Sequence, residues 1–69
     1  MTTVKVIELQ GESDESWEDA AQSAVQDASD TLQGISGIEV VSQTADIDDD
    51  GQITRYNTTV NVAFTLQRD

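Results

Sequence analysis

The stretch ITRYNTTVNVAFTL, residues 53–66, restricts the fold of this chain more than any other segment. Its side chains separate into two sets that alternate along the stretch. One set is Tyr56, Thr58, Val60, Val62, Phe64 and Leu66, and the other is Arg55, Asn57, Thr59, Asn61, Ala63 and Thr65. A period of two residues is that of a β-strand with one buried face. The pattern therefore predicts a long strand that needs a second layer on its apolar side.

A helix that could supply this layer is predicted to begin after Ser13, with an apolar stripe over residues 17–32. Its apolar residues recur at helical spacing, and they are Trp17, Ala20, Ala21, Ala24, Val25, Ala28 and Leu32. Most of them are small, which favours close packing against a sheet. We predict Ser13 as the N-cap and Gly34 as the C-terminal cap. Trp17 belongs to the apolar stripe and is expected in the core.

Two further strands are predicted, over residues 3–9 and 35–47. β-branched residues dominate TVKVIEL, and the following QGESDES is interpreted as the end of that strand and the start of the helix. The predicted order is β-α-β-β within a single domain over residues 1–69. This is an α+β fold of two layers, in which the helix covers one face of the sheet.

Such a small unit is expected to need neighbouring copies. A chain of 69 residues buries only about 60% of the surface that its unfolded form exposes. Disulfides or a metal often stabilise domains of this size, but the chain has no cysteine and no histidine. Self-association is therefore the predicted means of stabilisation. The same absences leave only carboxylates, hydroxyls and Tyr56 for catalysis, so we do not expect an enzyme.

The charge balance excludes several classes of partner. Fourteen acidic residues against three basic ones give a formal net charge of -11. A chain this anionic is expected to repel nucleic acid and anionic lipid. Acid-rich, lysine-poor surfaces are typical of halophilic proteins, so a halophilic source is expected, and an ordinary acidic protein is the alternative. With no apolar run of about 20 residues and no signal peptide, a cytoplasmic location is expected.

The acidic stretch before Gly51 has two interpretations. Asp46, Asp48 and Asp50 have the spacing of a calcium loop, but both flanks are predicted strands and the twelfth position is Asn57 rather than an acid. An EF-hand is therefore excluded. A hairpin turn ending at Gly51 is one interpretation. The other is a weaker cation site on Asp46, Asp48 and Asp50 that takes Ca²⁺, Mg²⁺ or Na⁺ through oxygen ligands.

Nearly the whole sequence resembles the dodecins. The resemblance rests on VIELQGESDESWEDAAQSAVQDASDTL, on I-x-x-I-E-V at 35–40, on G-x-I-x-x-Y at 51–56 and on VNVAF at 60–64. It implies a three-stranded antiparallel sheet wrapped around the helix, and a hollow homododecamer. It also implies a non-catalytic function in binding, storing or buffering a flavin, FMN or riboflavin. The alternatives are another small, flat aromatic ligand, or a structural or cation-binding shell that uses the acidic hairpin at residues 46–50.

The resemblance also implies where a flavin would bind. In flavin-binding members a tryptophan on the second strand stacks on the ring, and this chain has Gly37 at that position. A glutamine on the third strand contacts the flavin edge, and the shorter amide of Asn57 replaces it. Asp46 corresponds to the charged partner near the end of the second strand. The candidate cofactor-binding residues are therefore Gly37, Asp46 and Asn57.

Overall fold

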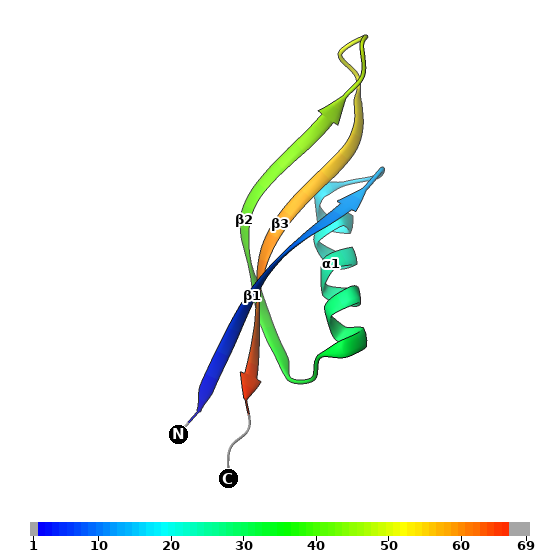
Figure 1. Ribbon diagram of the computed structural model, residues 1–69. Helices are drawn as coiled ribbons and strands as arrows, with labels where there is room; N and C mark the ends of the chain where they lie inside the picture. The colour runs from blue at the N-terminus through cyan, green and yellow to red at the C-terminus, as the bar shows by residue number, and fades with distance from the viewer. Residues whose placement is uncertain (1, 67–69) are drawn as a thin grey trace.

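The computed structural model describes residues 2–66 and confirms the predicted β-α-β-β order (Figure 1). Its elements are β1 (Thr3–Ser13), α1 (Trp17–Thr31), β2 (Ile35–Ile47) and β3 (Ile53–Leu66). Residues 1 and 67–69 of the predicted domain lie outside the described residues. The predicted bounds of the second and third strands agree with β2 and β3.

The strand with the clearest sequence pattern is the central strand of the sheet. The strand order is β1-β3-β2, and both neighbours run antiparallel to β3. Helix α1 lies on one face, against β1 and β3, and the β2–β3 hairpin extends beyond the helix (Figure 1). Because β3 alone is bonded on both edges and covered by the helix, its alternation between buried and less buried side chains is the strongest in the chain.

The core lies between α1 and β3. Val60 and Val62 are fully buried, and Ala24 and Ala28 pack against them from the helix. Five partly buried residues surround this cluster, namely Ile7, Leu9, Ala21, Leu32 and Ile35. The alanines let the helix backbone approach the sheet closely, as their small size predicted. The core is small, as expected for a chain of this length.

The first strand is longer than its predicted range of residues 3–9. β1 continues to Ser13, with Gly11 paired to Thr58 and buried beneath the helix. A Cβ atom on Gly11 would lie 1.8 Å from the carbonyl oxygen of Ala20. The glycine therefore does not end the strand. It allows β1 and α1 to approach each other more closely than any side chain would permit.

The N-cap of the helix is Ser16 rather than the predicted Ser13. The Ser16 side chain accepts a hydrogen bond of 2.9 Å from the backbone N–H of Asp19. Ser13 is the last residue of β1, and its hydroxyl accepts from the N–H of Glu15 and donates to the Asp19 carboxylate at 2.7 Å. The prediction was wrong because the continued strand displaces the helix start by three residues.

The predicted C-terminal cap is also displaced. Leu32 is the C-cap, and its N–H donates to the carbonyl of Ala28. Gly34 follows in the connection to β2 with φ of +78°, a conformation that glycine adopts without steric cost. Its carbonyl accepts from the N–H of Thr65, so Gly34 joins the end of the helix to the sheet.

Apolar side chains remain exposed on the two edge strands and near the hairpin. They are Val4, Val6, Ile38, Val40, Val41, Ile47 and Ile53, each between 41% and 65% exposed. The helix packs mainly on β1 and β3, which leaves β2 largely uncovered. Within residues 2–66, no helix is long and apolar enough to cross a membrane.

Candidate functional site

The acidic stretch between β2 and β3 forms a compact hairpin turn. The N–H of Gly51 donates to the carbonyl of Asp48, and Gly51 has φ of +79°. The side chain of Asp48 accepts from the N–H groups of Asp50 and Gln52, at 2.9 and 3.0 Å. The turn interpretation is therefore confirmed, and one oxygen of Asp48 is already occupied by the backbone.

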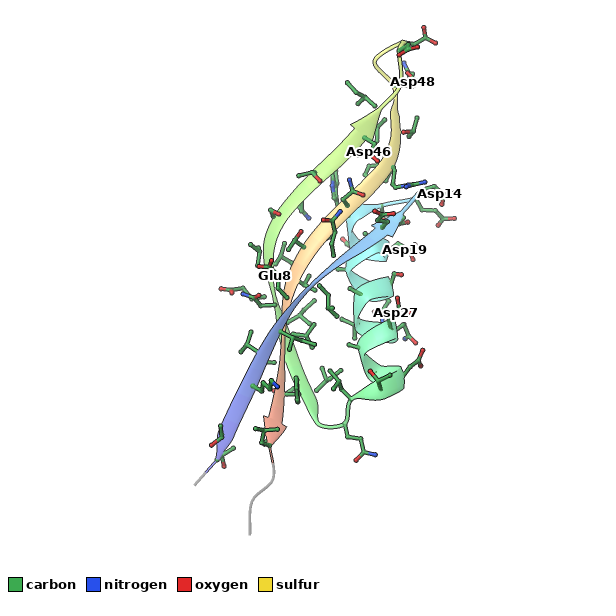
Figure 2. All side chains as sticks on the ribbon, in the orientation of Figure 1. Glu8, Asp14, Asp19, Asp27, Asp46 and Asp48 are labelled. Atoms are coloured by element: carbon green, nitrogen blue, oxygen red, sulfur yellow. The ribbon has the colours of Figure 1, made fainter. Side chains whose placement is uncertain are left out.

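The structure does not bring the three candidate metal ligands of the turn together. Figure 2 shows Asp48 at the hairpin and Asp46 farther down β2. Across the described part of the chain, no group of three acidic side chains is placed to hold a metal ion. A site made from Asp46, Asp48 and Asp50 would need contributions from other copies, so it stays a prediction.

Asp46 is instead held beside the other candidate, Asn57. Asn57 on β3 is paired with Thr44 on β2, and Asp46 lies one pair farther along the same sheet face. The amide nitrogen of Asn57 donates to the Thr44 hydroxyl at 3.3 Å and to the Asp46 carboxylate at 3.2 Å. We call Thr44, Asp46 and Asn57 the amide cluster. It lies on the sheet face opposite α1, because Asn57 alternates with the helix-facing Thr58.

The amide cluster contains a buried acceptor without a donor and a carboxylate without a cationic partner among the described residues. Asn57 is 7% exposed, and its side-chain oxygen is buried without a hydrogen-bond partner among the described residues. Arg55 pairs with Asp46 in the strand register, but its guanidinium lies 3.3 Å from Glu12 on the other side of β3. Leaving a buried acceptor unbonded costs about 1–3 kcal/mol, so a ligand that engages this oxygen would be stabilised.

Gly37 lies far from the amide cluster within one protomer. It pairs with Ala63, six residues from Asn57 along β3, which at the rise of an extended strand is roughly 20 Å. A Cβ atom at Gly37 would meet nothing within 4 Å, so the position is open. A single site containing Gly37 and Asn57 would therefore need residues from two copies.

Trp17 is not in the core, contrary to the sequence-based expectation. Its ring is half-buried at the start of α1 and meets Tyr56 edge to face, with ring centroids 4.8 Å apart. The indole N–H donates to the backbone carbonyl of Thr44 at 2.9 Å. The first residue of the helix is thereby fixed to the strand that carries the amide cluster. Nothing in the spacing of the apolar stripe indicated this contact.

An open pocket of about 390 Å³ lies at the junction of β1 and α1 and is lined by Glu12, Ser13, Asp14, Asp19 and Arg55. Most of its polar side chains already bond to one another. Ser13 bonds to Asp19, and Glu12 forms an ion pair with Arg55. Figure 2 shows Asp14 and Asp19 at this junction. These contacts fix the start of the helix.

Comparison with known proteins identifies the family. The family model described as Dodecin matches residues 3–67. The chain belongs to the dodecin family. A curated member, the calcium dodecin of Mycobacterium tuberculosis, is 39% identical over 67 residues, which cover 97% of this chain and 93% of the relative. The predicted resemblance and the predicted fold class are both confirmed.

Solved dodecin structures share the fold along the whole chain. A Thermus thermophilus protein is 30% identical, with a TM-score of 0.92 and full coverage of both chains. The dodecin of Streptomyces davaonensis is 31% identical, with a TM-score of 0.89 and 97% of each chain covered. The M. tuberculosis calcium dodecin structure is 36% identical, with a TM-score of 0.81, covering 97% of this dodecin and 94% of the relative. That relative is described as a calcium-chelating antigen with a novel calcium-binding site.

Proposed function

We propose that this dodecin is a non-catalytic, homododecameric shell that binds divalent cations, with Ca²⁺ as the preferred ion. The exposed apolar side chains on β1, β2 and the hairpin supply the surfaces that twelve copies would bury. The net charge of -11 per chain attracts cations to any surface on which copies meet. Carboxylate, amide and hydroxyl oxygens are the ligands that hard cations prefer, and the chain has no cysteine or histidine for softer metals.

The observation that carries this proposal is the amide cluster. It combines a carboxylate without a cationic partner among the described residues with a buried amide oxygen that lacks a donor. The identity of 39% to a protein named calcium dodecin supports the same ion.

Isothermal titration calorimetry of the assembled protein with Ca²⁺ tests the proposal. We expect saturable binding at constant KCl concentration, with Ca²⁺ preferred over Mg²⁺ because a partly exposed oxygen site does not enforce the strict octahedral geometry that Mg²⁺ requires. Equilibrium dialysis should give the same stoichiometry. If the protein binds no Ca²⁺ beyond a screening effect that KCl reproduces, the proposal is wrong.

Flavin binding is the second candidate function. The open position of Gly37, on the same sheet face as Asn57, is the observation that favours it. Gly37 offers no aromatic face, however, and a stacked aromatic pair contributes about 0.5–1.5 kcal/mol beyond the area that it buries. We therefore expect FMN or riboflavin to bind more weakly than Ca²⁺, through the amide of Asn57.

Quenching of flavin fluorescence tests this second function. The variant Gly37→Trp should strengthen FMN and riboflavin binding by about tenfold or more, because it adds the missing ring at an open position. The control Gln26→Trp adds the same ring at an exposed position of α1 and should leave binding unchanged. Equal binding by all three proteins would contradict a flavin site at Gly37.

A further inference from the structure

The side-chain amide of Asn57 forms hydrogen bonds through its nitrogen but none through its oxygen among the described residues. Its nitrogen faces β2 and bonds to Thr44 and Asp46, whereas its oxygen is buried and has no donor among the described residues. Rotation of an amide by half a turn exchanges oxygen and nitrogen, which are nearly equal in size. The strand does not need to move for this exchange. Asn57 can therefore present either atom to Asp46 and Thr44.

In the absence of an ion, the nitrogen is the atom that should face Asp46. An amide N–H donates to the carboxylate, whereas an amide oxygen in the same place would meet a carboxylate that can only accept and would be repelled by its negative charge. A bound cation reverses this preference. It would attract the carboxylate, the hydroxyl oxygen and the amide oxygen to the same point. The orientation of Asn57 is thus coupled to whether an ion is present.

The spacing of the amide cluster already suits a cation. The side-chain nitrogen of Asn57 lies 3.2 Å from an Asp46 carboxylate oxygen and 3.3 Å from the Thr44 hydroxyl oxygen. Oxygen ligands of Ca²⁺ lie 2.3–2.6 Å from the ion, so neighbouring ligands stand about 3–3.5 Å apart. After rotation, the Asn57 oxygen would therefore stand at a ligand-to-ligand distance from both partners.

We propose that Thr44, Asp46 and Asn57 supply three oxygen ligands of a divalent-cation site, and that the side-chain amide of Asn57 rotates by half a turn when the ion binds. The inference rests on the proposed cation-binding function and assigns its site to the sheet face rather than to the hairpin turn. Water or residues of a second copy complete the six to eight ligands of Ca²⁺. Rotation also directs the amide nitrogen toward β1, where Glu12 is the register partner of Asn57.

Luminescence of Tb³⁺, used as a probe for Ca²⁺, tests the location of the site. Trp17 is the single tryptophan, and its indole N–H donates a hydrogen bond of 2.9 Å to the Thr44 carbonyl. Excitation of this ring should therefore sensitise Tb³⁺ in the amide cluster, and added Ca²⁺ should remove the signal. Asp46→Asn and Thr44→Val should each weaken Tb³⁺ binding by about tenfold or more.

Asp27→Asn is the matched control, because it removes the same charge from an exposed position of α1. It should leave Tb³⁺ luminescence and Ca²⁺ affinity within about twofold of the unmodified protein. Asp50→Asn tests the hairpin turn as the other location of the site. Asp46 and Thr44 are exposed side chains, so their variants should fold, which circular dichroism can check. If Asp46→Asn keeps full affinity while Asp50→Asn loses it, the proposed site is wrong although the protein still binds Ca²⁺. If the unmodified protein binds no Ca²⁺, the proposed function itself is wrong.

Asn57→Asp tests whether residue 57 is a ligand of the ion. A carboxylate offers an oxygen on either side and needs no turn to bind the ion, so this variant should bind Ca²⁺ more tightly than the unmodified protein. Without an ion, it should be less stable, since two carboxylates then face each other. The rise in melting temperature on adding Ca²⁺ should therefore be larger for Asn57→Asp. An equal or smaller rise would overturn the role of Asn57.

Discussion

Gly11 and Gly37 both lie within strands, but only Gly11 is required by packing. A Cβ atom on Gly11 would overlap the backbone of Ala20 and lie 3.1 Å from the backbone nitrogen of Ala24. Neither group is the end of a flexible side chain, so the helix itself would have to move. A Cβ atom on Gly37 would have open space around it. The two glycines therefore differ in their tolerance of a single added methyl group.

The substitution Gly11→Ala should destabilise the protein by about 1–3 kcal/mol or more, as overpacking of a close contact does. The midpoint of urea unfolding at a fixed protein concentration measures the effect. Gly37→Ala adds the same methyl group to another strand and should change the midpoint little. Equal midpoints for the two variants would contradict the close approach of β1 and α1.

Asn57 shows which part of the candidate site could be predicted from sequence. The alternation in residues 53–66 placed Asn57 on the face opposite the helix, and the family resemblance marked it as a ligand residue. Its burial depends on its central position in the sheet, and its partners depend on the register with β2. The bulge between Val40 and Ser42 shifts that register by one residue. Because the alternation within one strand does not specify the bulge, Thr44 was not predicted as part of the cluster.

At the level of elements, the accuracy of the predictions followed the strength of the local pattern. The bounds of β2 and β3 were predicted correctly, because each strand ends at a clear change of composition. The start of the helix was not, since Ser13 and Ser16 both precede acidic residues and either could serve as a cap. The correct choice depended on Gly11 continuing β1, which is a tertiary contact. A glycine in a strand is interpreted as the end of that strand when the residue that packs against it is not known.

The N-cap gives a direct test of the helix start. Ser16→Ala removes the acceptor of the Asp19 N–H and should cost about 1 kcal/mol, which chemical unfolding can measure. Ser29→Ala replaces an exposed serine within α1 and should leave stability equal or slightly higher, since alanine favours helix. A larger loss for Ser29→Ala than for Ser16→Ala would contradict this cap.

Strand β2 is the element that most needs a neighbouring copy. Val40 pairs with Val60 on the helix side of the sheet, yet it is 49% exposed because the helix covers β2 so little. We expect Val40→Glu to reduce the fraction of assembled protein severalfold, since it places a charge where apolar contact is needed. Gln26→Glu adds the same charge on an exposed position of α1 and should assemble normally. Size-exclusion chromatography of both variants measures the difference.

For the whole molecule, charge opposes the assembly that apolar burial favours. Twelve copies would each bring a net charge of -11, and salt screens this repulsion over about 10 Å at 0.1 M and 3 Å at 1 M. The melting temperature should therefore rise with KCl concentration. Sodium sulfate also strengthens apolar burial, so KCl and sodium sulfate at equal ionic strength separate the two effects. A melting temperature independent of KCl would contradict the role of repulsion.

One chain is expected to be completed by other copies of itself. Its buried core contains only six apolar residues among those described, three of them alanines, while seven large apolar side chains stay exposed. Light-scattering mass measured across a dilution series in concentrated KCl tests this most directly. We expect a particle of twelve chains that loses its fold as it dissociates. A single chain of 69 residues that stays folded and melts cooperatively at every dilution would contradict it.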